Sequence, residues 1–189
     1  FPGLLVQCLS YKTRDFRMDN GKMEKEWVDY CKTTTEEFEY WIKQGKYLEY
    51  NKYEDKKAPE GFSYYGTWKD EVMELLKSTH VIKELDVNGY KMLLEQTLDF
   101  PYFGFFLDAG NMDIIRRMKL RGTKNNGLIL SGVINTRVNT AKEERRIFNE
   151  LMKNHPNHNI HFVDANQDAY GVYKDVTSII KEYIPAMSL

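Results

Sequence analysis

Short apolar segments that alternate with amphipathic helical segments are the feature that most constrains the fold of this chain. Strands are expected at 4–9, 81–87, 102–107 and 160–163. Apolar residues at helical spacing predict helices at 88–96, 112–120, about 134–152 and 170–183. Strands that alternate with helices are typical of βαβ units, so we expect an α/β protein with a parallel sheet flanked by helices.

The stretch from Trp27 to Gly66 interrupts this alternation and is rich in Tyr. Strands are expected at 46–50 and 62–66, and helices at 34–43 and 68–77. The second helix is predicted because Thr67 and Asp70 have the spacing of a capping box. We therefore expect a small mixed α+β insert on a parallel-sheet core.

The charge balance argues against one class of function. Lys and Arg number 27 and Asp and Glu number 28, so the net charge is −1, unlike that of a globally basic nucleic-acid-binding protein. No apolar run approaches the ~18 residues of a membrane helix. Because no signal peptide is visible either, we expect a cytoplasmic protein, monomeric or homodimeric, that binds neither nucleic acid nor a membrane.

Polar residues follow the first two predicted core strands at their carboxyl ends. Ser10, Arg14 and Arg17 come just after the first strand, and Glu84 and Asp86 end the second. Ligands of doubly wound sheets bind outside the carboxyl ends of the strands, so these residues can face one cleft. Two arginines at this spacing can bind phosphate oxygens in a fork.

Several of these residues also have a purely structural interpretation. An isolated pair of arginines commonly forms surface ion pairs, and Asp86 precedes a predicted helix that it can cap. Glu49 lies in the aromatic strand segment Tyr47-Leu48-Glu49-Tyr50, where a solvated strand face is the simpler interpretation. The residues by themselves leave these alternatives open.

An ordered set of motifs resembles the guanylate kinase family. Ser10-Tyr11-Lys12-Thr13-Arg14-Asp15-Phe16-Arg17 is similar to the family's Ser-x-x-Thr-Arg-x-x-Arg segment, with Lys12 where Thr is usual. The further matches, in the family's order, are Glu24, Tyr30, Glu36-Glu37-Phe38, Gly45-Lys46-Tyr47-Leu48-Glu49-Tyr50, Tyr64-Tyr65-Gly66-Thr67, Glu84-Leu85-Asp86-Val87-Asn88-Gly89, Arg117, Arg121-Gly122-Thr123, Arg137 and Asp164-Ala165-Asn166. Each motif is weak alone, but together they cover nearly the whole chain.

The resemblance implies a P-loop nucleoside-monophosphate kinase that transfers the ATP γ-phosphoryl group to GMP or dGMP, with Mg²⁺ bound to ATP. It implies a core at 1–17, 78–120 and 134–189, a GMP-binding insert at 18–77 and a lid at 121–133. The lid contains Gly122, Asn125, Asn126 and Gly127, so we expect it to be mobile.

The resemblance also implies how GMP is bound. Glu49 and Asp86 would accept the N–H donors of guanine, and Ser10 and Thr67 would serve its acceptor edge. The residues that would hold the GMP phosphate are Arg14, Arg17, Tyr30 and Tyr65, with Glu24 positioning an arginine.

The remaining matches concern residues that, in the family, take part in phosphoryl transfer. By resemblance, Arg117, Arg121 and Arg137 would be catalytic, closing over the transferring group. Arg121 and Asn166 would also contact ATP, and Glu84 would lie near its Mg²⁺. These assignments follow from the resemblance only.

One family motif is absent from the residues given. No Gly-x-x-x-x-Gly-Lys-[Ser/Thr] loop occurs, although this loop cradles the ATP phosphates. Because the chain begins at Phe1 without Met, we expect the loop upstream and the given residues alone to be inactive. The alternative is a guanylate-kinase-like protein-binding module that has lost catalysis.

Overall fold

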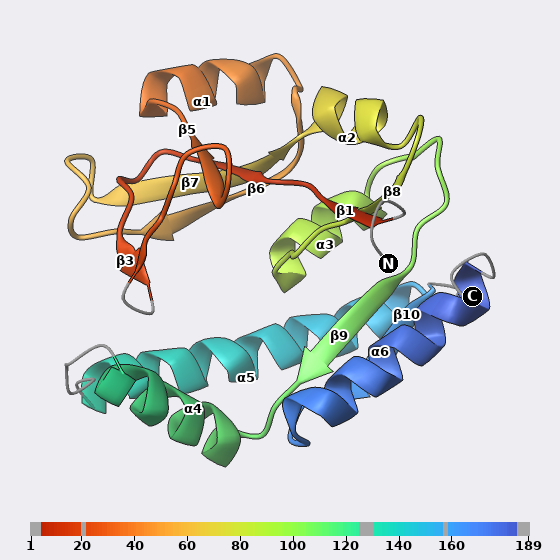
Figure 1. Cartoon of the computed structure of the whole chain (residues 1–189). Helices are drawn as coiled ribbons and strands as arrows, with labels where there is room; N and C mark the ends of the chain where they lie inside the picture. Colours follow the sequence, from red (N-terminus) through yellow and green to blue (C-terminus); the bar gives the residue numbers. More distant parts are fainter. Residues whose placement is uncertain (1–4, 20–21, 125–130, 157–158, 185–189) are drawn as a thin grey trace. The chain divides into compact units, whose positions relative to one another are not determined.

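The computed structural model describes residues 5–19, 22–124, 131–156 and 159–184 (Figure 1). Its contacts divide the chain into two compact units, Phe1–Thr97 and Leu98–Leu189, and each unit has strands and helices of its own. The expected boundaries of a core, an insert and a lid stay a prediction.

The first unit is built on a four-stranded sheet in the order β5-β2-β7-β6. Its strands are β2 (Ser10–Lys12), β5 (Tyr30–Lys32), β6 (Tyr47–Glu54) and β7 (Phe62–Trp68). β2 runs parallel to β5 and antiparallel to β7, so the sheet is mixed, and it includes β2, which lies outside the stretch expected to form the mixed insert. β6 and β7 form a hairpin whose register sets Glu49 opposite Thr67.

Helix α1 (Thr35–Lys43) begins at a capping box. The Thr34 hydroxyl oxygen accepts from the backbone N–H of Glu37, and the Glu37 carboxylate accepts from the backbone N–H of Thr34, both at 3.2 Å. These bonds satisfy backbone donors that the first helical turn leaves free. The predicted helix at 34–43 is confirmed.

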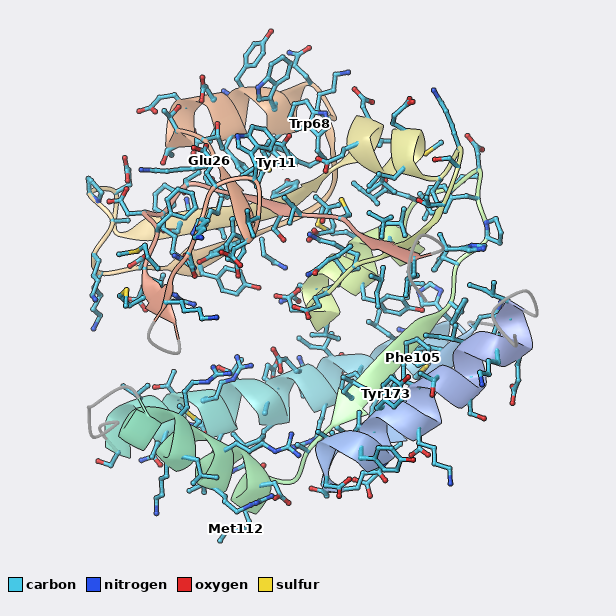
Figure 2. All side chains as sticks on the ribbon, in the orientation of Figure 1. Tyr11, Glu26, Trp68, Phe105, Met112 and Tyr173 are labelled. Carbon is cyan, nitrogen blue, oxygen red and sulfur yellow. The ribbon has the colours of Figure 1, made fainter. Side chains whose placement is uncertain are left out.

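Aromatic side chains fill the space between α1 and the sheet. Phe38 on α1 is fully buried and stacks on Tyr47, with ring centroids 4.1 Å apart. Tyr11 and Trp68 pack into the same cluster, with centroids 5.4 Å apart (Figure 2). The Tyr-rich stretch that interrupts the strand–helix alternation thus supplies a core of its own.

The remaining elements of the first unit are β1 (Leu5–Gln7), β3 (Met18–Asp19), β4 (Lys22–Met23), α2 (Lys69–Leu75), β8 (His80–Ile82) and α3 (Val87–Leu94). β1 and β8 pair in parallel, as the alternation predicts. β3 and β4 form a short antiparallel pair, and α3 contacts β6.

The predicted strand at 81–87 was wrong at its end. The strand stops at Ile82, and Val87 is the first residue of α3. The reason is Asp86, whose Oδ1 accepts the backbone N–H of Gly89 at 2.8 Å and so starts the helix there.

The predicted capping box of α2 was also wrong. The residue before this helix is Trp68, which makes no side-chain cap. Thr67 instead belongs to β7, and its hydroxyl donates to Glu49 across the hairpin. The pairing of β6 with β7 therefore overrides the local helix signal.

The second unit contains β9 (Gly104–Asp108), α4 (Asn111–Lys124), α5 (Ser131–Asn154), β10 (Ile160–Asp164) and α6 (Ala169–Tyr183). β9 and β10 pair in parallel along their whole length. Phe106 stacks on Phe148 of α5 at 3.8 Å, and Phe103 stacks on Tyr183 of α6 at 4.3 Å. Both α5 and α6 therefore pack against this strand pair (Figure 1).

Parallel strand pairs flanked by helices confirm the expected α/β class. The stretch expected to be a mobile lid is only partly described: α4 continues through Lys124, α5 begins at Ser131, and 125–130 lie outside the described residues. Among the helices in the described ranges, none combines the length and apolar character needed to cross a membrane.

Candidate functional site

Glu24 is the centre of a buried ion-pair cluster in the first unit. Arg14 donates to both of its carboxylate oxygens at 2.7 Å, and Lys12 donates to Oε2 at 2.6 Å. None of the three side chains is more than 7 % exposed. The hydrogen bonds from Arg14, opposed by burial and aided by Lys12, lower the pKa of Glu24 to about 2. Glu24 therefore stays ionised and holds the Arg14 guanidinium in one orientation.

Arg14 also contacts two tyrosines. Its Nε donates to the Tyr65 hydroxyl, and the Tyr30 ring centre lies 5.5 Å from the guanidinium carbon. Burial works against the charged form, but the bonds to Glu24 and Tyr65 raise the pKa of Arg14 above its ordinary value. Arg17 lies 3.4 Å from Glu24 with its side chain 66 % exposed. The four residues expected to hold a phosphate are thus brought together around Glu24.

Glu49 and Thr67 form a second polar pair, buried on adjacent strands. The Thr67 hydroxyl donates to Glu49 Oε1, and Glu49 is 7 % exposed. Burial raises the pKa of Glu49, while the Thr67 bond opposes this rise. Gly89 passes so near that a Cβ there would lie 2.7 Å from Glu49 Oε2. The interpretation of Glu49 as part of a solvated strand face was therefore wrong.

Asp86 lies at the start of α3 and binds three groups. Its Oδ1 accepts from the Gly89 N–H at 2.8 Å and from Asn51 Nδ2 at 2.6 Å, and the Tyr53 hydroxyl donates to Oδ2. The helix-cap interpretation is confirmed. The charge of Asp86 also contributes to the raised pKa of Glu49, so the two carboxyl groups share one environment.

Ser10 is held by a lysine that the sequence analysis did not single out. Lys83 Nζ donates to Ser10 Oγ at 2.6 Å and to the carbonyl oxygen of Cys8 at 3.2 Å. Burial lowers the pKa of Lys83. The charges of Glu49 and Lys83 influence each other's pKa, so the Lys83–Ser10 and Glu49–Thr67 pairs belong to one polar region of the first unit.

Arg117 and Asn166 lie in the second unit, near the carboxyl ends of β9 and β10. Arg117 Nη2 donates to the carbonyl oxygen of Ala165, and Asn166 Oδ1 accepts the backbone N–H of Gly110 at 2.6 Å. Asp164 Oδ1 accepts from Asn166 Nδ2 at 2.6 Å. Asn166 therefore links the segments that follow β9 and β10, and Arg117 links α4 to the segment after β10.

Three further predicted residues are exposed: Arg121 on α4, Arg137 on α5 and Glu84 between β8 and α3. Arg137 lines a surface hollow between α4 and α5 with Met118 and Thr140. Within the described ranges, no group of three or more His, Cys, Asp or Glu is arranged to hold a metal ion. The roles of these three residues stay predictions.

Residues with polar contacts at these places that were not assigned a role from the sequence include Lys12, Asn51, Tyr53, Lys83 and Arg145. The sequence did contain a signal for Lys83, because a lysine within the predicted strand segment Val81-Ile82-Lys83-Glu84-Leu85 is unusual. The sequence contained no such signal for Arg145, which lies among other charged residues of α5. Arg145 nevertheless binds the Asp108 carboxylate at 2.5 Å and the carbonyl oxygen of Ala109.

No family model matches the chain, but named relatives do. Guanylate kinase of Oceanobacillus iheyensis is 35 % identical over 130 residues, which are 67 % of this chain and 56 % of the relative. Guanylate kinase of Fusobacterium nucleatum subsp. nucleatum is 35 % identical over 136 residues, 70 % of this chain and 64 % of the relative. The chain thus spans 56–64 % of the length of these two relatives.

The fold is similar to that of a solved structure. The crystal structure of guanylate kinase from Anaplasma phagocytophilum superimposes with a TM-score of 0.61, covering 95 % of this chain and 76 % of that one, at 16 % identity. At 16 % identity this similarity supports the assignment of the fold and nothing beyond it.

Proposed function

Because this chain belongs to the guanylate kinase family, we propose that the protein transfers the γ-phosphoryl group of ATP to GMP or dGMP, yielding ADP and the nucleoside diphosphate. One observation carries the proposal. A single unit holds both a pair of carboxyl groups, Glu49 and Asp86, and an arginine–tyrosine cluster around Glu24. The carboxyl groups suit the donor edge of guanine, the arginines suit a phosphate, and GMP has both.

Guanine recognition follows from the hydrogen-bond capacity of the acidic pair. Guanine presents N–H donors on the edge where adenine offers an acceptor, and Glu49 and Asp86 can accept them. Thr67 donates its proton to Glu49 Oε1 and so orients that carboxylate. A wrong base would leave a buried carboxylate unpaired, which costs about 1–3 kcal/mol or more.

Phosphate binding rests on the cluster around Glu24. Arg14 is already oriented by its two bonds to Glu24, so little side-chain entropy is lost on binding. Arg17 is exposed and can approach a second phosphate oxygen. Tyr30 and Tyr65 lie with rings 6.2 Å apart beside Arg14 and would add hydroxyl groups.

The transfer step would use the second unit. Phosphoryl transfer depends mainly on positioning and on stabilising the charge of the transferring group. Arg121 and Arg137 are exposed arginines suited to that task, and Arg117, which donates to the Ala165 carbonyl oxygen next to Asn166, would lie beside the ATP. Mg²⁺ would neutralise ATP phosphate charge, and the exposed Glu84 is the carboxylate that would approach it.

Two experiments test the proposal. Calorimetric titration of this chain with GMP, AMP, CMP and UMP tests the acceptor site, and GMP is expected to bind most tightly. A coupled assay for ADP release, on the full-length protein with the same four nucleotides, tests catalysis. Lack of GMP binding in the first experiment refutes the acceptor site, and lack of GMP-dependent ADP release in the second refutes the enzyme.

The second candidate function is a guanylate-kinase-like protein-binding module without catalysis. Such a module does not need a Gly-x-x-x-x-Gly-Lys-[Ser/Thr] loop, and the 189 residues contain none. This candidate predicts no ADP release from the full-length protein whether or not GMP binds. A cytoplasmic location and a monomeric or homodimeric state stay predictions of the sequence.

A further inference from the structure

Lys83 is a half-buried cation to which the proposed function assigns no role. It leaves β8 and donates to Ser10 Oγ at 2.6 Å and to the Cys8 carbonyl oxygen at 3.2 Å. Its pKa is lowered by burial, while Glu49 and Glu71 oppose that effect. Removing an ammonium group from water costs stability unless protein groups replace the lost hydrogen bonds with water. The Ser10 and Cys8 oxygens do so here, and they hold the ammonium group in one position.

The bond from Lys83 determines what Ser10 can offer to a ligand. An ammonium group has donors and no acceptor, so the Ser10 oxygen is necessarily the acceptor in this pair. The hydroxyl proton of Ser10 therefore points elsewhere, and the described residues contain no group to which Ser10 Oγ donates. A hydroxyl that accepts from a cation is polarised and becomes a stronger donor.

The polar region around Ser10 therefore contains groups of opposite character. Lys83 and the Ser10 proton favour a partly negative atom such as a carbonyl oxygen. Glu49 and Asp86 favour N–H donors, and the charges of Asp86 and Lys83 both act on the pKa of Glu49. Guanine has a carbonyl oxygen at position 6 and adenine an amino group, so Lys83 and the Ser10 proton distinguish these two bases.

We propose that Lys83 is a positioning residue that turns the Ser10 hydroxyl into a donor for the 6-carbonyl oxygen of a purine nucleotide, and so selects 6-oxopurines against 6-aminopurines. The inference rests on the proposed function, because it assumes that the base of GMP occupies this region. Beyond that function, it assigns a role to Lys83 and explains why the Ser10 hydroxyl donates a hydrogen bond to the base.

The test compares three nucleotides that differ in one group, using calorimetric titration of this chain. GMP and IMP both have the 6-carbonyl oxygen, and IMP lacks only the 2-amino group. 6-Thio-GMP keeps the donors of GMP but has sulfur at position 6, a weaker acceptor. We expect Lys83→Met to weaken GMP and IMP binding about tenfold or more, and 6-thio-GMP binding by less than threefold. Lys77→Met, an exposed lysine paired with Glu74, is the matched control.

Two further variants separate positioning from a merely structural effect. In a Ser10→Ala background, Lys83→Met should change GMP affinity less than twofold, because the hydroxyl it acts through is gone. Lys83→Gln keeps a donor without the charge and should fall between wild type and Lys83→Met, which keeps the test valid if Lys83→Met fails to fold. Equal losses for all three nucleotides, or an undiminished effect without Ser10, would overturn the inference. If wild-type protein binds no GMP, the proposed acceptor site fails first and the inference with it.

Discussion

Arg14 and Glu24 form a two-pronged ion pair in which each terminal guanidinium nitrogen lies 2.7 Å from a different carboxylate oxygen. The pair is nearly inaccessible to water, and Lys12 binds the same carboxylate from β2. One acid thus faces two buried bases, so it neutralises only part of their charge. An anion placed beside Arg14 would complete the balance, which is the arrangement expected of a phosphate site.

Replacing this acid should destabilise the first unit. Glu24→Gln keeps the shape but leaves Arg14 and Lys12 buried without a counter-charge, so the free energy of unfolding should fall by about 2 kcal/mol. Urea denaturation followed by tryptophan fluorescence measures the change. Glu26→Gln, an exposed neighbour, is the control and should leave the midpoint unmoved. Equal behaviour of the two variants would contradict the importance of the cluster.

The acid sensitivity of the protein should depend on the same carboxylate. The pKa of Glu24 is about 2 in the folded chain against an ordinary 4.5, so its contribution is full above pH 4.5 and is lost as pH falls toward 2. Wild type should therefore lose more stability than Glu24→Gln between pH 5 and pH 2. Denaturation curves across this range measure the difference between the two proteins. Glu49, whose raised pKa has the opposite effect on stability, is present in both proteins, so its contribution cancels in the comparison. Parallel pH profiles would rule out this account.

Glu49 should show opposite effects on stability and on binding. Burial raises the pKa of its carboxyl, so the ionised form costs stability at neutral pH and Glu49→Gln should leave the melting temperature unchanged or higher. GMP affinity should fall about tenfold to a hundredfold, because an amide has one acceptor oxygen and a donor NH2 group where the carboxylate has two acceptor oxygens. Calorimetry and thermal melting test both effects. Glu54→Gln, at the exposed end of the same strand, should change neither.

The two roles assigned to Asp86 can be separated by the choice of substitution. Asn caps helices about as well as Asp, whereas Ala does not, so Asp86→Ala should lose about 1 kcal/mol of stability and Asp86→Asn little. Both variants should lose GMP affinity, because neither has a carboxylate. Chemical denaturation and calorimetric titration measure the two effects. If Asp86→Asn binds GMP like wild type, the carboxylate contacts no guanine donor.

Arg145 should be a stability residue of the second unit. It binds the Asp108 carboxylate, the Ala109 carbonyl oxygen and Asn111 Oδ1, all at the end of β9. Arg145→Met should therefore reduce the free energy of unfolding by about 1–2 kcal/mol. The adjacent Arg146 bonds only to exposed glutamates of its own helix, so Arg146→Met is a matched control expected to have little effect. Hydrogen exchange of β9 amides gives a local measure of the same difference.

The strand and helix order was predictable from the sequence because each element has its own periodicity. Phe38 and Trp41 mark the buried side of α1, and the apolar segments before α3 and α4 become parallel strands. The predicted ends of helices and strands were wrong where one side chain had two possible hydrogen-bond partners. Asp86 begins a helix inside a run that otherwise suggests a strand, and Thr67 bonds across a hairpin rather than along the chain.

Contacts within the candidate site were less predictable than its members. Arg14 was named from its place after the first predicted strand and Glu49 from the family resemblance, but their burial depends on strand pairing that no local pattern records. Lys83 and Ser10 are 73 residues apart and meet only because β1 pairs with β8. Such pairs become visible once the register of the sheet is known.

All residues proposed to contact GMP precede Thr97, the last residue of the first unit. If these residues bind GMP as proposed, the choice of acceptor nucleotide is encoded in one uninterrupted stretch of gene. A single recombination event between the codons of α3 and those of β9 would then transfer that choice to another protein of this fold. The proposed acceptor site could therefore be exchanged or engineered separately from the second unit.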